Sequence, residues 1–418
     1  MNPKRWLIVF LVLSACTLTV WSAAAQAGPV PGAGVTEELA RGESAYPAAN
    51  LVESEPNNAL DKPDLLAPGN VIAGVISGKF DQDYYRIDIP DVTTAVLIDI
   101  DAEALGSPLD AEICLYDNTL AEVTCNDDAD GRDSLIFASL WPESCVPCAP
   151  YYVRVRDADY PNEGGAAFTY HLAVYRPLLI SAATDGVVAG IPFERADILA
   201  HYDFADGTQK WSMFFDASDV GITSNVVGLA TQFNFEDIAL VLRSPQELPI
   251  NGVMRTVTPY DVLYFVAREG GRFGTKTEGQ FYMGYEGARH GLSGSGEKID
   301  ALTVPFFVST EVTATFASGE TARDEDISNL PYGYLSFDGS RLPGLGTQDV
   351  AAADEGGGSN PIAGHYLTIA GIGRVGGQRV TPKDIFVVPW WTYNMGGIVW
   401  RGPVHGFTYD IDAFDIVD

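Results

Sequence analysis

A repeat in the C-terminal half constrains the fold of this chain more than any other feature. Four segments begin with an aspartate followed by Ile or Val, and these aspartates, spaced 64, 65 and 58 residues apart, are Asp197, Asp261, Asp326 and Asp384. Aromatic segments, Gly-containing turns and further strand-like runs recur in phase with them. Such self-similarity is typical of architectures built from stacked sheet units.

The last repeat is incomplete, because DIDAFDIVD (410–418) lacks the two strands that follow its counterparts in the other units. A copy of those strands stands instead at the beginning of the repeats, in residues 178–203. A closed β-propeller joins its ends in this way, since pairing the first and last segments removes a free sheet edge. We therefore predict an all-β protein whose second module, residues 177–418, is a four-bladed β-propeller closed by its N- and C-terminal strands.

An export signal precedes the folded part. Two basic residues stand before a long apolar run that ends at small residues, so we expect residues 1–27 to be a cleaved signal peptide and residues 28–49 a linker. Leu13-Ser14-Ala15-Cys16 offers an alternative, a lipoprotein lipidated at Cys16. We expect a secreted protein, attached to a membrane only through Cys16 or through an uncleaved signal.

The charge of the chain restricts its partners. The formal net charge is −31, and such a surface repels phosphate backbones, so we expect no nucleic-acid partner. Carboxylates are also the oxygen ligands that hard cations prefer, calcium above all.

Four cysteines remain after the export signal, all in one short region. They are Cys114, Cys125, Cys145 and Cys148. An even number in an exported chain indicates disulfides, with three possible pairings. The CxxC spacing of Cys145 and Cys148 would also suit a redox pair or half of a zinc site, but a second CxxC and a nearby histidine are both missing, which favours structural disulfides.

The first module, residues 50–176, alternates apolar and polar residues in short runs, which predicts an antiparallel β-sandwich. It opens with ESEPNN (53–58), continues with GKFDQDYY (78–85) and includes the strand-like runs YYVRV and YHLAV. In these motifs and their order it resembles the bacterial pre-peptidase C-terminal domain, a jelly-roll sandwich related to collagen-binding domains of collagenases. The resemblance implies a secreted accessory module of the kind that accompanies peptidases.

The resemblance also implies a calcium site. The matching positions are Glu53, Glu55, Asn57, Asn58, Asp81 and Asp83. Calcium takes six to eight oxygen ligands, which two loops of carboxylates and amides can supply. The alternative is an ordinary turn with solvated acids. Asn126-x-Asp128-x-Asp130-Gly131 has the spacing of an EF-hand start, but Phe137 stands where the glutamate is required, which favours a plain acidic turn.

The recurring aspartates are the sharpest constellation in the second module. In a closed ring, Asp197, Asp261, Asp326 and Asp384 could surround a cation or a basic ligand group. Their recurrence in every unit favours a structural role instead, in which each carboxylate accepts backbone hydrogen bonds in the turn before a strand.

Catalytic motifs are missing from the sequence. It contains no HExxH, GxSxG or Walker motif. His290 and His405 occupy equivalent repeat positions, which favours a structural role. Either stacking on sugars or packing in the core is possible for five aromatic residues, Trp211, Trp390, Trp391, Tyr393 and Trp400. We expect a secreted, non-catalytic binding or cell-surface protein with a polysaccharide or protein ligand. The alternatives are an extracellular hydrolase of glycans or peptides, and a structural envelope or matrix component.

Overall fold

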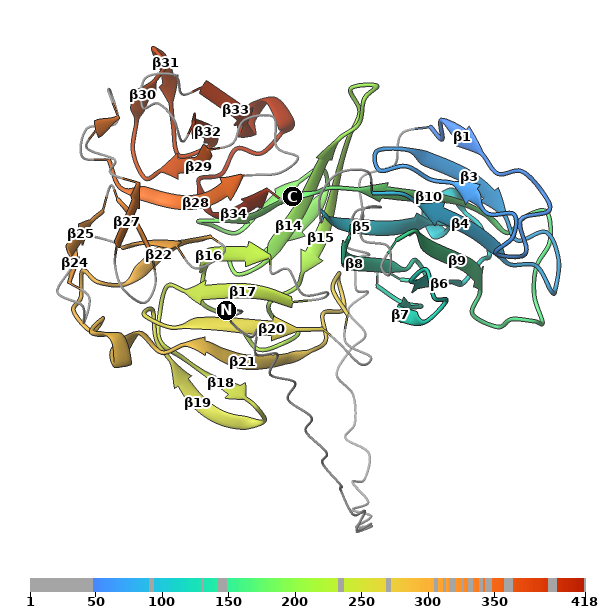
Figure 1. Cartoon of the computed structure of the whole chain (residues 1–418), viewed down its shortest axis with the longest axis horizontal. Coiled ribbons are helices and arrows are strands. Elements are labelled where there is room, and N and C mark those ends of the chain that lie inside the picture. Colours follow the sequence, from blue (N-terminus) through green and yellow to red (C-terminus); the bar gives the residue numbers. More distant parts are fainter. Residues whose placement is uncertain are drawn as a thin grey trace, which may run out of the picture. The chain divides into compact units, whose positions relative to one another are not determined.

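The computed structural model describes most of the chain beyond the expected linker, and its fold is all-β (Figure 1). The described residues are 48–89, 94–129, 131–141, 149–231, 237–267, 272–303, 307–310, 313–315, 321–324, 326–329, 334–337, 341–342, 348–356, 364–389 and 397–416. The predicted signal peptide, Cys16, Cys145 and Cys148 lie outside them. Within these ranges, no helix has the length and apolar character needed to cross a bilayer.

Two five-stranded sheets form the first module. One has the order β1 (Leu51–Val52), β3 (Val71–Val75), β10 (Thr169–Tyr175), β5 (Thr94–Asp101), β8 (Leu135–Leu140). The other has the order β2 (Asp64–Leu65), β4 (Asp83–Ile87), β9 (Tyr151–Asp157), β6 (Ala111–Tyr116), β7 (Glu122–Asn126). Alternate residues of β9 are buried, because successive side chains of a strand point to opposite faces. Ile98 and Val153, from different sheets, belong to one hydrophobic core.

One disulfide joins neighbouring strands of the second sheet. Cys114 of β6 lies directly opposite Cys125 of β7, and their Sγ atoms are bonded at 2.02 Å. The structure thus pairs these two cysteines with each other.

Four larger sheets form the second module, and each contains one run of four hydrogen-bonded strands. The first run is β15 (Gln209–Phe215), β14 (Ile198–Asp203), β11 (Leu178–Ala182), β34 (Ile411–Ile416). The second is β16 (Val226–Thr231), β17 (Asp237–Leu242), β20 (Val262–Val266), β21 (Gln280–Tyr285), to which the hairpin of β18 (Gln246–Ile250) and β19 (Val253–Val257) is added. The third is β22 (Ile299–Thr303), β23 (Phe307–Thr310), β26 (Ile327–Asn329), β27 (Tyr334–Phe337), and the fourth is β28 (Val350–Gly356), β29 (Gly364–Ile369), β32 (Asp384–Pro389), β33 (Gly397–Arg401).

The two ends of the second module share a sheet. β34 runs antiparallel to β11, with Asp415 opposite Leu179 and Phe414 opposite Ile180. This pairing is the one that the incomplete last repeat predicts. One end strand of each run also contacts its counterparts in cyclic order, β16 with β22, β22 with β28, β28 with β34 and β34 with β16.

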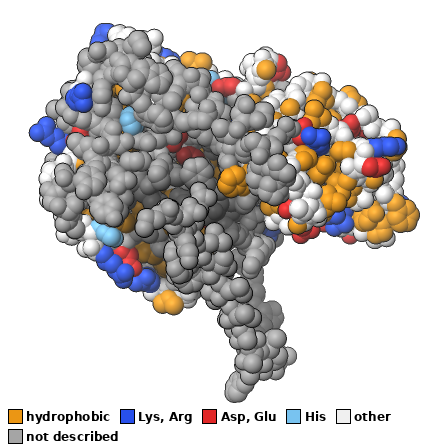
Figure 2. All heavy atoms as spheres, viewed as in Figure 1, with side chains coloured by type: hydrophobic (Ala, Val, Ile, Leu, Met, Phe, Trp, Pro, Cys, Tyr) orange, Lys and Arg blue, Asp and Glu red, His pale blue; other side chains and the backbone are white. Residues whose placement is uncertain are grey.

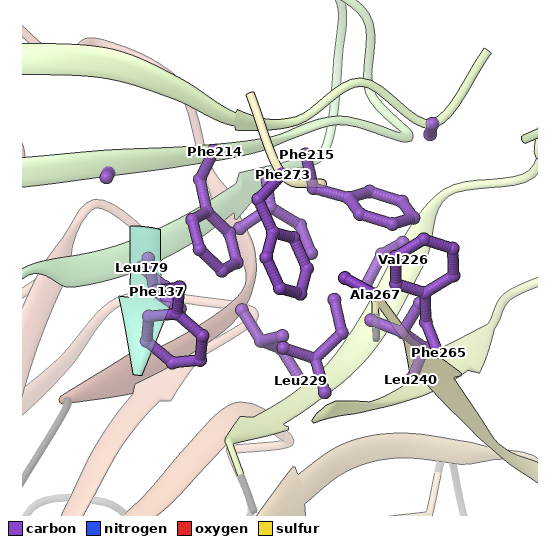
Figure 3. Packing of buried hydrophobic residues seen from close by; sticks show 14 of the residues in the cluster. Phe137, Leu179, Phe214, Phe215, Val226, Leu229, Leu240, Phe265, Ala267 and Phe273 are labelled. Atoms are coloured by element: carbon purple, nitrogen blue, oxygen red, sulfur yellow. The ribbon is translucent and has the colours of Figure 1, made fainter. Parts of the chain in front are cut away.

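Buried aromatic side chains join the first module to the second. The ring of Phe137 in β8 lies 5.1 Å from that of Phe214 in β15 and 5.6 Å from that of Phe273, in edge-to-face arrangements (Figure 3). Such pairs stabilise a core beyond the area that they bury. A buried ion pair also joins the two modules. Lys210 Nζ of β15 lies 2.9 Å from Asp99 Oδ2 of β5, and both side chains are at most 2% exposed.

We predict that Lys210→Met lowers the free energy of unfolding by about 3–5 kcal/mol, because it leaves a buried carboxylate without its cation. Urea unfolding monitored by fluorescence measures the change. The matched control is Lys276→Met, since Lys276 Nζ is 4.0 Å from Asp128 and half of that side chain is exposed. Equal effects of the two substitutions would contradict the prediction.

Candidate metal centre

Two loops of the first module bring three carboxylates together. Glu55 follows β1, while Asp81 and Asp83 lie in and directly after the turn that leads into β4. One carboxylate oxygen from each of the three residues lies within 4.8 Å of the others. Glu55 is exposed and the two aspartates are buried. Two segments that are distant in sequence therefore supply one acidic cluster.

Two buried oxygens at this cluster lack hydrogen-bond donors. Asn57 and Asp83 are both 0% exposed, and Asn57 Oδ1 and Asp83 Oδ1 accept no hydrogen bond. Leaving a buried acceptor unsatisfied costs about 1–3 kcal/mol, and more for a charged group. A hard cation bound between these oxygens would supply the missing interaction. The residues present therefore fit a calcium ion in the donor chemistry that it requires.

The remaining predicted ligands support the cluster from its sides. Asn58 Nδ2 donates to Asp81 Oδ1, and Ser77 Oγ donates to Asp81 Oδ2 at 2.6 Å. Glu53 Oε1 accepts a hydrogen bond from the backbone N–H of Val75 at 2.7 Å. Glu53 thus ties the segment after β1 to β3, and it does not belong to the group of three close carboxylates.

A buried pair of tyrosines lies behind Asp83. The hydroxyl oxygens of Tyr85 and Tyr170 are 2.6 Å apart, and Tyr170 Oη donates to Asp83 Oδ2. Tyr85 Oη also donates to Glu53 Oε2 at 3.1 Å. The tyrosine hydroxyl thus holds one oxygen of the Asp83 carboxylate, while the other oxygen, Oδ1, has no donor.

Two acids at this site, Asp83 and Glu53, have pKa values above those of ordinary carboxyls. Burial, followed by the charge of Glu53, raises the pKa of Asp83 to about 9. Burial also raises the pKa of Glu53. A divalent cation would reverse the balance, because opposite charge at short range favours the ionised carboxylate.

Asp64 was not anticipated from the sequence, although it organises the same loop. Its Oδ2 accepts hydrogen bonds from the Ser54 backbone N–H at 2.8 Å and from Asn57 Nδ2 at 3.4 Å. Asp64 belongs to the two-residue strand β2, and no motif in its neighbourhood marks it. Only the parallel pairing of β2 with β4 places it beside the 53–58 loop.

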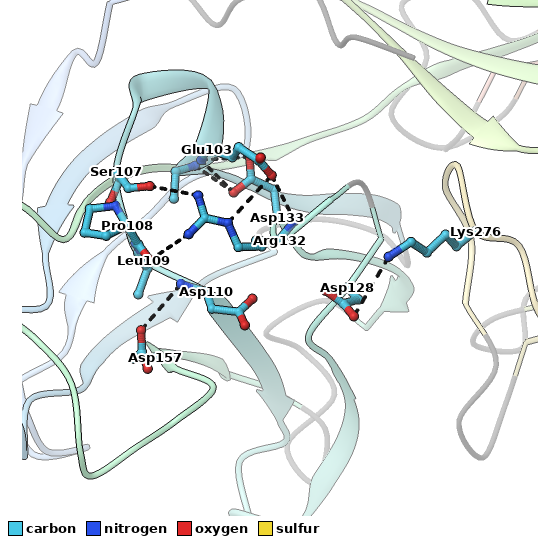
Figure 4. A network of polar contacts seen from close by, with 11 residues as sticks. Glu103, Ser107, Pro108, Leu109, Asp110, Asp128, Arg132, Asp133, Asp157 and Lys276 are labelled. Carbon is cyan, nitrogen blue, oxygen red and sulfur yellow. Dashed lines mark hydrogen bonds and ion pairs between the residues drawn. The ribbon is translucent and has the colours of Figure 1, made fainter. Parts of the chain in front are cut away.

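In the acidic turn that contains Asn126 and Asp128, the polar side chains contact other residues of the protein (Figure 4). Asn126 Oδ1 accepts from the Leu135 backbone N–H at 3.2 Å, and Asp128 faces Lys276. Asp133 Oδ1 accepts from the backbone N–H groups of Ala102 and Glu103 at 2.9 and 3.0 Å. Asp130 lies outside the described residues. Among those that are described, this turn forms no cluster of three metal-ligating side chains.

Each recurring aspartate of the second module lies at the start of its strand, with Asp197, Asp261 and Asp326 directly before the strand and Asp384 as its first residue. Its Oδ2 accepts the backbone N–H of the residue three positions earlier, for Asp197 from Glu194 at 2.7 Å, for Asp261 from Thr258 at 2.8 Å, for Asp326 from Arg323 at 3.1 Å and for Asp384 from Thr381 at 2.9 Å. These are the backbone hydrogen bonds that a structural role of the repeated aspartates predicts. In the described part of the chain, none of the four belongs to a cluster of metal-ligating side chains.

A cavity of about 360 Å³ lies in the second module. Its lining comprises Ala183, Arg243, Asp300, Asp349, Ala351, Ala370, Pro382, Asp410, Ile411 and Asp412. Asp412 Oδ1 accepts from Arg243 at 3.0 Å, and its Oδ2 accepts from Asn225 Nδ2 at 2.8 Å. Asp300 and Asp412 occupy equivalent positions of their units, directly after the first residue of β22 and of β34, where the other two units have Val227 and Ala351.

Trp211 and Trp400 are buried in the hydrophobic core of the second module. Neither therefore offers an exposed face for stacking on a sugar. Trp390, Trp391 and Tyr393 lie outside the described residues. On the face shown in Figure 2, the first module carries hydrophobic, acidic and basic side chains intermingled, so its acids do not gather into one patch there.

Comparison with known proteins gives little beyond the fold class. No protein-family model matches the chain, and no curated protein matches it. Among solved structures, it is similar to the pre-peptidase C-terminal domain of a collagenase from Bacillus anthracis. That similarity has 18% identity, covers 28% of this chain and 99% of that chain, and has a TM-score of 0.22. A similarity of this size assigns neither a family nor an activity.

We predict that, without divalent cations, the stability of the wild-type protein relative to Asp83→Asn falls as the pH rises from 5 to 8. The unfolded chain releases the Asp83 proton near the ordinary pKa of 3.8, whereas the folded chain holds it up to about 9. The folded state therefore binds more protons in this interval, and its stability declines with rising pH. Urea midpoints in EGTA measure the difference. Asp61→Asn, at an exposed position, is the control, and parallel profiles for wild type and Asp83→Asn would refute the prediction.

Proposed function

We propose that the first module is a jelly-roll β-sandwich of the pre-peptidase C-terminal type that binds calcium. Two five-stranded sheets over one core and the motifs at 53–58 and 78–85 support this assignment. Glu55, Asn57, Asp81 and Asp83 would hold the ion. Bound there, calcium would neutralise the buried acids and tie the 53–58 loop to the start of β4.

We further propose that the second module is a four-bladed β-propeller. The pairing of β11 with β34 and the cyclic contacts of β16, β22, β28 and β34 support it. Four-stranded units in a closed ring leave few unpaired sheet edges, as an exported protein requires to remain unaggregated.

The function that we propose is that of a secreted, non-catalytic binding protein. Its ligand is an extracellular protein or polysaccharide that presents a positively charged group to the cavity of the second module. One observation carries this proposal, the composition of the cavity wall. The described lining residues include four acids, Asp300, Asp349, Asp410 and Asp412, and one cation, Arg243, while Lys383 Nζ lies 3.7 Å from Asp410 Oδ1. The acids outnumber these cations, and acids in a concave site attract and orient a cationic group.

The same wall gives no support to a serine- or cysteine-type hydrolase. None of the described residues that line the cavity is a serine, cysteine or histidine. The nucleophile and base of a serine- or cysteine-type hydrolase therefore do not meet there.

We predict that calcium raises the thermal midpoint of the wild-type protein and that Asp81→Asn abolishes this rise. The physical reason is that an ion bound to the folded state alone stabilises it by mass action. Calorimetry in EGTA and in excess calcium measures the shift, and elemental analysis gives the metal content. Asp61→Asn should retain the full shift. No bound calcium and no shift in the wild type would remove calcium from the proposal.

We predict that the protein binds amine-bearing polymers, such as polylysine or chitosan, more tightly than neutral dextran. Asp300→Asn and Asp349→Asn should each weaken this binding roughly tenfold, which corresponds to about 1.4 kcal/mol. Raised salt should weaken it as well, because charges are screened. Biolayer interferometry measures the affinities.

The control for these variants is Glu163→Gln, which removes one exposed acid of the first module. It should leave binding unchanged if the cavity is responsible. Equal losses in the control and in the cavity variants would show that net charge, rather than the cavity, attracts the polymer.

A further inference from the structure

A second cluster of ligating side chains lies in the second module, away from the acids of the first. His201 and Asp203 come from β14, and His405 ends the 3₁₀ turn Gly402–His405. His201 Nε2 lies 3.6 Å from Asp203 Oδ1, and His405 Nδ1 lies 3.2 Å from the same oxygen. The three ligand atoms all lie within 4.8 Å of one another.

The backbone places these groups on one side of the sheet. His201 and Asp203 are two residues apart on a strand, so their side chains leave the same face. Asp203 pairs with Gln209 of β15. His405 approaches from the turn after β33, where its ring stacks on Trp400 with 5.2 Å between centroids and 7° between planes.

One nitrogen of this cluster is buried without a hydrogen-bond partner. His201 is 2% exposed, and its Nε2 atom makes no hydrogen bond. An unsatisfied imidazole nitrogen beside a second imidazole and a carboxylate requires a physical explanation.

The repeat supplies no structural explanation for His201. Four residues after the recurring aspartate, where the first unit has His201, the second has Phe265 and the fourth has Val388. Both of these apolar side chains are buried. His201 therefore departs from a hydrophobic position, and a residue that breaks a repeat in this way has a role particular to one unit. In the second unit, His290 stacks on Tyr285 instead, with ring centroids 4.6 Å apart.

The cluster is closed on one side and open on the other. The ring of Trp211 lies 4.4 Å from that of His201. Asp203 is half exposed, which gives an ion a route from solvent. Gln209 Nε2 lies 2.9 Å from His405 Nδ1, and this contact must be given up when His405 Nδ1 ligates a metal.

We propose that His201, His405 and Asp203 bind a divalent transition-metal ion of the zinc type. Two imidazole nitrogens and one carboxylate oxygen are a donor set for zinc and its neighbours rather than for calcium, which prefers oxygen throughout. Three protein ligands leave a fourth position for solvent or for a ligand of the protein. This site is separate from the calcium centre and does not depend on the proposed cationic ligand.

The test uses the untagged mature chain, treated with chelator and returned to buffer with excess calcium so that the oxygen site is saturated. Titration with Zn²⁺ by calorimetry should show one tight site per chain. Co²⁺ in its place should give visible ligand-field absorption. His201→Phe, which restores the residue of the second unit, should remove this site, and Asp203→Asn should weaken it at least tenfold.

The matched control is His290→Val, which removes the equivalent of His405 from another unit and should leave zinc binding unchanged. Asp203→Asn alters a half-exposed side chain, so it tests the proposal even if His201→Phe does not fold. The proposal is overturned if the wild type shows no tight site, or if Asp203→Asn binds zinc as the wild type does. A loss in His290→Val equal to that in Asp203→Asn would equally count against it.

Discussion

The antiparallel pairing of β34 with β11 is the interaction on which the second module depends. It places Phe414 opposite Ile180 and so joins the two ends of the module, whereas each of the other large sheets consists of strands close together in the sequence. Without it, β34 would lose its backbone partners and the buried side of β11 would face solvent. β16, β22 and β28 also contact β34, so the position of this one strand affects all four sheets. The cavity wall formed by Asp410, Ile411 and Asp412 depends on the same pairing.

Two buried carboxylates, those of Asp99 and Asp83, differ in the partners that the protein gives them. Asp99 has a buried cation, Lys210, at 2.9 Å, and Tyr175 donates to it as well. Asp83 has a tyrosine donor on one oxygen and nothing on the other. The first arrangement is complete within the chain, and under the proposed function an external cation would complete the second. This contrast would separate a carboxylate that serves stability from one that serves binding.

The repeats show a comparable division between common and particular residues. Asp197, Asp261, Asp326 and Asp384 make the same backbone hydrogen bond in every unit, which is what a turn requires. The side chains with candidate binding roles are not common to the units. His201 stands where Phe265 and Val388 pack, and Asp300 and Asp412 correspond to apolar residues in other units. In a repeat protein, departures from the pattern are therefore more informative about function than the pattern itself.

The sequence by itself determined the all-β class, the sharing of strands between the ends of the second module, and the two loops of the first module that carry Glu55, Asp81 and Asp83. These features follow from period and order along the chain, which strand alternation and repeat spacing record directly. Only the tertiary structure decided that Asp64 and the Tyr85–Tyr170 pair support that centre, and that His201, Asp203 and His405 meet. Such contacts join residues up to about two hundred positions apart, and no local periodicity encodes which side chains the packing of the sheets brings within bonding distance.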